Sequence, residues 1–105
     1  MLSIAICDDE EYFRTTEKKL ISKYMAGKNC ECMIDMYESG KELLALRSAI
    51  SQYNIIFLDV NMEEIDGIET AKEIRKISKD VFIVFVTAFI TYALEGYKVD
   101  AVRYL

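Results

Sequence analysis

Two short apolar runs restrict the fold of this chain more than any other feature. Residues 54–58 (NIIFL) and 81–86 (VFIVFV) are apolar at nearly every position, and Asp59 and Thr87 follow them directly. A strand that is apolar on both faces has to be covered on both sides, as the interior strands of a parallel sheet are. Both runs are far too short to cross a membrane. They therefore predict two central strands of a parallel sheet, each followed by a polar residue.

Strand and helix patterns alternate around these two runs. Further strands are predicted at residues 2–7, 32–37 and 99–105. Helices are predicted after the acidic residues 8–11, from the capping box of Ser39 and Glu42, after Asp66 and Gly67, and over residues 88–95, and the first and last of them end near Gly27 and Gly96. Their apolar positions are Phe13, Leu20, Ile21 and Tyr24 in the first helix, Leu43, Leu46 and Ile50 in the second, and Ile68, Ala71 and Ile74 in the third. This alternation predicts an α/β doubly wound fold in which a five-stranded parallel sheet has helices on both faces, with residues 1–105 as one domain.

Composition excludes several classes of function. The net charge of −5 and the pI near 4.7 leave no basic face for nucleic-acid binding by this segment. Because the chain has no histidine, any chemistry must use carboxylates, hydroxyls and backbone amides. The three cysteines include no Cys-x-x-Cys pair and are too few for an ordinary zinc site. Reduced cysteines, together with a start that lacks the pattern of a signal peptide, lead us to expect a cytoplasmic protein.

Polar residues gather at the predicted carboxyl ends of the strands. Asp8 and Asp9 follow the first strand, Asp59 the third and Thr87 the fourth. Ligands of open parallel sheets bind outside these ends, where the strand order reverses. If the order is 2-1-3-4-5, the first and third strands are neighbours, and the three carboxylates converge with a hydroxyl beside them. The alternative is a structural role for each aspartate, as a helix cap or a strand end.

Three carboxylates in one crevice repel each other, and a hard divalent cation would remove that conflict. Mg²⁺ prefers such oxygen ligands and keeps positions open for phosphate oxygens. A carboxylate can also attack a phosphoryl group to form an aspartyl-phosphate, which needs positioning, a cation and hydrogen-bond donors. We therefore interpret Asp59 as the nucleophile, Asp8 and Asp9 as the residues that hold the cation, and the Thr87 hydroxyl and the Ala88 amide as donors. No Gly-rich phosphate loop is present, which argues against a nucleotide substrate.

Four segments carry a resemblance to a known family: ICDDE at 6–10, FLDVNMEEIDG at 57–67, VTA at 86–88 and VRYL at 102–105. In this order and spacing, over the whole chain, they resemble the receiver domains of two-component response regulators. The stretch from Thr87 onward is most similar to receivers that precede a LytTR-type DNA-binding domain. The resemblance implies a flavodoxin-like receiver fold and a phosphoacceptor switch that is not an enzyme in the usual sense. It also implies a partner histidine kinase, allows a homodimer, limits DNA contact to a separate output domain, and implies no contact with a membrane.

The same resemblance implies a role for each matching residue. Asp59 is the phosphoacceptor, Asp9 a direct Mg²⁺ ligand, Asp8 a ligand acting mainly through water, and Asn61 a ligand through its backbone carbonyl. Thr87 is then the switch hydroxyl, Ala88 contributes its backbone amide, and Tyr104 is the switch aromatic. The alternative for Tyr104 is an ordinary aromatic of an edge strand, since aromatic residues are common in strands.

Two positions depart from the family pattern. Receivers usually carry proline four residues after the acceptor aspartate, and this chain has Glu63 there. The family's lysine is expected about three residues after Tyr104, whereas the sequence ends at Leu105. We therefore expect a receiver truncated before its last helix.

Two rival functions stay open. A Mg²⁺-dependent phosphatase with an aspartyl-phosphate intermediate would carry a second aspartate two residues after the nucleophile as general acid. That position is Asn61, a poor acid. A receiver-like interaction module without phosphorylation would fit the missing lysine but not the intact set of aspartates and Thr87.

Overall fold

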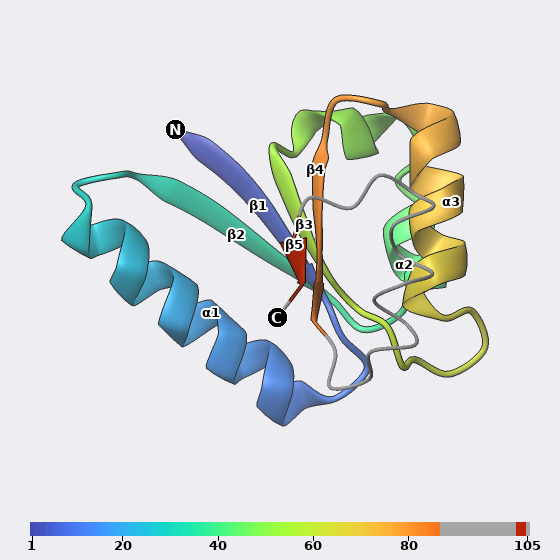
Figure 1. Cartoon of the computed structure of the whole chain (residues 1–105), viewed down its shortest axis with the longest axis horizontal. Coiled ribbons are helices and arrows are strands. Elements are labelled where there is room, and N and C mark those ends of the chain that lie inside the picture. Colours follow the sequence, from blue (N-terminus) through green and yellow to red (C-terminus); the bar gives the residue numbers. More distant parts are fainter. Residues whose placement is uncertain (87–102, 105) are drawn as a thin grey trace.

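The sheet is parallel and follows the predicted strand order. The structure is a computed structural model that describes residues 1–86 and 103–104. Its strands are β1 (Leu2–Cys7), β2 (Cys32–Tyr37), β3 (Ile55–Asp59), β4 (Phe82–Val86) and β5 (Arg103–Tyr104), in the spatial order β2-β1-β3-β4-β5 (Figure 1). The order of the first four strands confirms the prediction. The fifth strand, predicted over 99–105, is described only where Arg103 and Tyr104 pair with Val84 and Phe85 of β4. The helix predicted over 88–95 lies outside the described residues.

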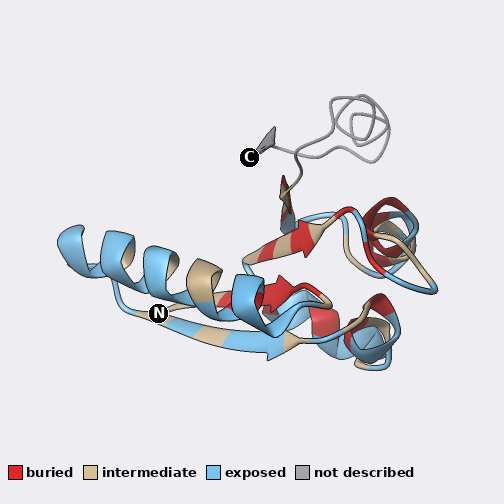
Figure 2. Cartoon of the chain, turned by 90° about the horizontal axis from the view of Figure 1, so that it is seen from below, coloured by how far each residue is buried: buried red, intermediate tan, exposed pale blue. Residues whose placement is uncertain are grey.

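One face of the sheet carries most of the hydrophobic core. It is covered by α2 (Gly40–Leu44), the 3₁₀ helix η1 (Arg47–Gln52) and α3 (Gly67–Ile77) (Figures 1 and 2). Alternate residues of the strands point into this core, among them Ala5 and Cys7 of β1 and Ile56 and Leu58 of β3. The predicted inward residues of α3, which are Ile68, Ala71 and Ile74, are buried there as well.

The second predicted helix is shorter than the sequence pattern indicates. The pattern extends through Leu46 to Ile50, but α2 ends at Leu44 and the chain continues as η1. Arg47 adopts a φ of 52°, a left-handed conformation that an α-helix cannot contain. The apolar spacing survives this break, because Leu43 and Ile50 are still buried in the core.

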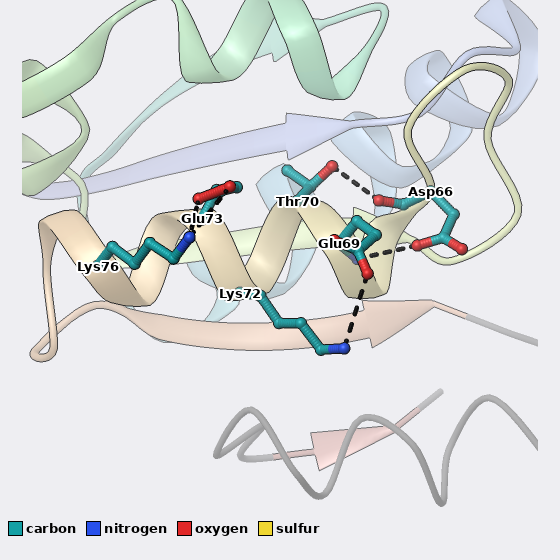
Figure 3. A network of polar contacts seen from close by, with 6 residues as sticks. All are labelled: Asp66, Glu69, Thr70, Lys72, Glu73 and Lys76. Atoms are coloured by element: carbon teal, nitrogen blue, oxygen red, sulfur yellow. Dashed lines mark hydrogen bonds and ion pairs between the residues drawn. The ribbon is translucent and has the colours of Figure 1, made fainter.

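The helix starts confirm the capping predictions. Ser39 Oγ accepts a hydrogen bond from the Glu42 amide at 3.1 Å, and Asp66 Oδ1 accepts one from the Glu69 amide at 2.8 Å. Along α3 the ion pairs Lys72–Glu69 and Lys76–Glu73 join residues one turn apart (Figure 3). The Asp66 carbonyl oxygen also accepts a hydrogen bond from the Thr70 hydroxyl at 2.8 Å. Both the side chain and the backbone of Asp66 therefore hold the start of α3.

Helix α1 (Glu11–Gly27) lies on the other side of the sheet, against β1 and β2 (Figure 1). Its apolar positions Phe13, Leu20 and Tyr24 are exposed, and Ile21 is half-buried. The buried residue of the helix is Arg14. The face of α1 that meets the sheet is therefore not the face that its apolar spacing marks.

Candidate functional site

The three predicted carboxylates meet at the carboxyl end of the sheet. Asp8 and Asp9 follow β1, and Asp59 is the last residue of β3. The two strands are neighbours, with Cys7 opposite Leu58, so both chains leave the sheet at the same point. One oxygen of each carboxylate lies within 4.8 Å of the others. The convergence predicted from the strand order is therefore confirmed for Asp8, Asp9 and Asp59.

The remaining predicted site residues are placed less completely. Asn61 lies in the loop after β3 and is exposed. Thr87 and Ala88 lie outside the described residues, and Tyr104 is described only as part of β5.

Backbone amides orient all three carboxylates. Asp8 Oδ1 accepts a hydrogen bond from the Glu10 amide at 2.9 Å, and Asp59 Oδ1 accepts one from the Asn61 amide at 3.2 Å. Asp9 Oδ2 accepts the amide of Glu63 at 3.3 Å. This last bond ties the loop after β1 to the loop after β3. Glu63, at the position where receivers usually carry proline, therefore contributes a backbone donor that proline lacks.

The start of α3 closes against the end of β3 at Gly67. The Gly67 amide donates to the Val60 carbonyl at 2.9 Å. A Cβ atom at Gly67 would lie 2.3 Å from the carbonyl oxygen of Asp59 and 2.8 Å from Val60 Cα. Only glycine fits this approach without moving the backbone that carries Asp59. Sequence reasoning placed Gly67 at a helix start but did not detect this contact.

Arg14 is a site residue that sequence reasoning missed. Its Nη1 donates to the Asp8 carbonyl at 2.8 Å, and its Nη2 lies 3.5 Å from Glu38 Oε1. The guanidinium thus fixes the backbone of Asp8 from α1 and links it to the loop after β2. A basic residue in a lysine-rich helix is usually solvated, so the sequence pattern held no signal for this contact.

Two carboxyls of the cluster, Asp8 and Asp59, hold their protons more tightly than isolated carboxyls do. Burial raises the pKa of Asp59 to about 7, with a further rise from the charges of Asp8 and Asp9 that the Asn61 amide partly offsets. Burial also raises the pKa of Asp8, for which the Glu10 amide is the main opposing influence. On α1, burial followed by the charges of Asp8 and Asp59 raises the pKa of Glu17 to about 8. A site with this surplus of buried carboxyls fits a divalent cation, which would stabilise their ionised forms.

The raised pKa of Asp59 makes cation binding depend on pH. Because a bound cation requires the ionised carboxylate, it must displace a proton below about pH 7. We expect the apparent Mg²⁺ affinity to fall on acidification from about pH 8 to about pH 6, approaching tenfold per unit below the pKa. Calorimetric titration in two buffers with different ionisation enthalpies measures both the affinity and the proton release. An affinity that stays constant over this range would contradict the raised pKa.

The raised pKa of Asp59 has the opposite consequence for folding without metal, which acidification favours. Its folded value of about 7 lies above the ordinary value of 3.8, so the folded chain binds a proton that the unfolded chain releases between these values. The contribution of Asp59 to stability is therefore complete below about pH 4 and is lost as the pH rises to about 7.

Comparison with known proteins decides the family. A model of the response regulator receiver domain matches residues 4–105. The chain belongs to this family. It is a receiver of the two-component type, a phosphoacceptor domain rather than a conventional enzyme, and receivers in general imply a partner histidine kinase. The predicted resemblance is thereby confirmed.

Curated relatives of this receiver are longer than the chain itself. The sensory transduction protein LytT of Oceanobacillus iheyensis is 34% identical over 106 residues, which cover 99% of this chain and 41% of the relative. The transcriptional regulatory protein LytR of Staphylococcus aureus is 32% identical over 100 residues, covering 95% of this chain and 39% of the relative. The chain thus spans about two fifths of the length of these relatives.

Solved structures support the same fold. The response regulator TrrA of Thermotoga maritima, solved in complex with Mg²⁺-BeF, has a TM-score of 0.83 and 31% identity, covering 100% of this chain and 85% of that one. A receiver domain protein of Clostridium thermocellum has a TM-score of 0.84 at 20% identity, covering 100% and 81%. Among the described residues of the present receiver, no helix has both the length and the apolar character that a membrane span requires.

Proposed function

We propose that this receiver is switched by phosphorylation of Asp59 in the presence of Mg²⁺. The observation that carries the proposal is the convergence of Asp8, Asp9 and Asp59 at the ends of two neighbouring strands. Asp59 lies at the end of an interior strand, and one of its carboxylate oxygens accepts a hydrogen bond from the Asn61 amide. The response regulator TrrA, 31% identical to this chain, was solved in complex with Mg²⁺-BeF, which supports Mg²⁺ as the cation.

Each residue of the site has a separate task in this proposal. Asp9 is a direct ligand of Mg²⁺, Asp8 acts mainly through a bound water, and Asn61 offers its backbone carbonyl. Bound Mg²⁺ would neutralise charge on the phosphoryl oxygens. Thr87 and Ala88 donate to these oxygens through a hydroxyl and a backbone amide, and Tyr104 follows Thr87 inward after phosphorylation.

The transfer requires an ionised and correctly positioned nucleophile, together with the cation and the hydrogen-bond donors named above. An oxygen of the Asp59 carboxylate attacks the phosphorus of a phosphohistidine on the partner kinase, and an O–P bond forms. The N–P bond of the donor breaks, and the imidazole nitrogen retains the electron pair and takes up a proton. Asp59 must be ionised to attack, and its fixed carboxylate lowers the entropic cost of the approach.

The output of the switch is proposed from the relatives. LytT and LytR are more than twice as long as the segment they share with this chain, and LytR is a transcriptional regulatory protein. We infer that this receiver acts in the cytoplasm and controls a LytTR-type DNA-binding domain that lies outside the sequence; this function is compatible with a homodimer. The acidic balance of the receiver supports DNA contact through that other domain only.

One assay separates this function from its rivals. Wild-type protein is incubated with acetyl phosphate, with and without Mg²⁺, while intact mass and phosphate release are followed. We expect one phosphoryl group per chain, added only with Mg²⁺, and slow release. Sustained turnover would instead indicate a phosphatase, and no mass gain with Mg²⁺ would indicate an interaction module.

A further inference from the structure

Glu17 carries a carboxyl with a buried oxygen, and the proposed function assigns it no role. It lies on α1, one turn after Arg14, which is the buried residue of that helix. Its Oε2 is inaccessible to solvent and has no hydrogen-bond partner among the residues that the structure describes. The carboxyl lies within hydrogen-bonding reach of the Asp8 side chain. Arg14 and Glu17 therefore approach Asp8 from the same helix, one at its backbone and the other at its carboxylate.

This placement is unfavourable for the chain alone. The Oε2 atom of Glu17 has lost its hydration without a hydrogen bond from the described residues to replace it. Asp8 and Asp59 add the repulsion of like charges. Within the part of the chain that the structure describes, the Arg14 guanidinium does not offset this, because it is directed to the Asp8 carbonyl and Glu38. A divalent cation among Asp8, Asp9 and Asp59 would reverse the sign of the interaction, since every nearby negative charge then stabilises it.

We propose that Glu17 is a positioning residue of the cation site, a fourth carboxyl that acts from α1 through Asp8 or through a water of the cation. The inference deepens the proposed function and rests on its metal site. In metal sites, side chains that hold the ligands contribute strongly to affinity, and their removal typically costs about 10–100-fold. Glu17 would thus set how tightly this receiver binds Mg²⁺ without contacting the phosphoryl group.

The test compares E17Q and E17L with wild type and with E11Q. Glu11 lies on the same helix and is exposed, so E11Q makes the same change in net charge without altering a buried group. Mg²⁺ affinity is measured by calorimetric or NMR titration at about pH 8, where Asp59 is ionised. Thermal unfolding without Mg²⁺ reports the structural effect of each substitution.

We expect Mg²⁺ binding to weaken about tenfold in E17Q and E17L and less than about twofold in E11Q. Without Mg²⁺, both Glu17 variants should be at least as stable as wild type.

Opposite signs in the two measurements distinguish a metal role from a packing role. If E17Q binds Mg²⁺ as tightly as wild type, or more tightly, the inference is overturned whatever E17L does. It is also overturned if both Glu17 variants bind Mg²⁺ more weakly and are also less stable than wild type without Mg²⁺. A packing defect would then account for both losses. Failure of the wild type itself to bind Mg²⁺ would overturn the proposed metal site as a whole, a result distinguishable from an intact site that ignores Glu17.

Discussion

Asp59→Asn is expected to abolish phosphorylation by acetyl phosphate. Asparagine has nearly the same shape and can still accept the Asn61 amide, so the loop after β3 should keep its conformation. It lacks the anionic oxygen that attacks phosphorus, and Asp8 and Asp9 hold the cation in the proposed function. Intact mass after incubation with acetyl phosphate and Mg²⁺ should show one added phosphoryl group in wild type and none in the variant.

A matched control excludes general effects of the substitution. Asp80→Asn makes the same chemical change at an exposed position before β4, at the opposite end of the sheet, and should be phosphorylated as wild type is. Thermal unfolding without Mg²⁺ should show Asp59→Asn to be no less stable than wild type, because burial disfavours the charge that the substitution removes. An unchanged mass gain in Asp59→Asn would assign the phosphoryl group to another residue and refute the proposed acceptor.

Gly67→Ala is expected to damage both stability and the site. The added Cβ would meet the Asp59 carbonyl oxygen at 2.3 Å and Val60 Cα at 2.8 Å, and both are backbone atoms that cannot rotate away. Overpacking of this kind typically costs about 1–3 kcal/mol. Because the atoms that must move carry Asp59, Mg²⁺ binding should weaken as well. Chemical denaturation and Mg²⁺ titration measure the two effects.

Gly27 offers the control for this substitution. It ends α1 on the surface, and a Cβ there would meet no atom within 4 Å. Gly27→Ala should therefore leave Mg²⁺ binding unchanged and alter stability by no more than about 1 kcal/mol, in the stabilising direction, because alanine favours a helix. Equal free energies of unfolding in the two alanine variants would show that the end of β3 can yield and that Gly67 is not required there.

The site was predictable to the extent that strand order determines which residues meet. The sequence shows apolar runs that end in Asp59 and Thr87, and an acidic pair after the first strand. These were enough to predict that Asp8, Asp9 and Asp59 meet, because parallel strands end at a common edge. The amide of Glu63 on Asp9 was not predictable. It depends on the path of an irregular loop, which no periodic pattern records.

Helix α1 shows where sequence patterns fail. Apolar spacing marks the face with Phe13, Leu20 and Tyr24, yet these side chains are exposed and the helix meets the sheet through Arg14 and Glu17. Amphipathic spacing identifies a face that is suited to burial but carries no information on what lies opposite. Here the carboxyl ends of β1 and β3 place a backbone carbonyl and carboxylates opposite the first turns of α1, and polar side chains meet them.

Local spacing and local hydrogen bonds were enough to predict the alternation of strands and helices, the interior position of β3 and β4, and the capped starts of α2 and α3. The remaining contacts of the site depend on tertiary packing. Only the packed chain brings Gly67 against the backbone of Asp59, Arg14 to the carbonyl of Asp8, and the unpaired oxygen of Glu17 beside the acidic cluster. These contacts join segments whose approach is fixed by the packing of helices on the sheet, and burial there is what changes the chemistry of the carboxyls.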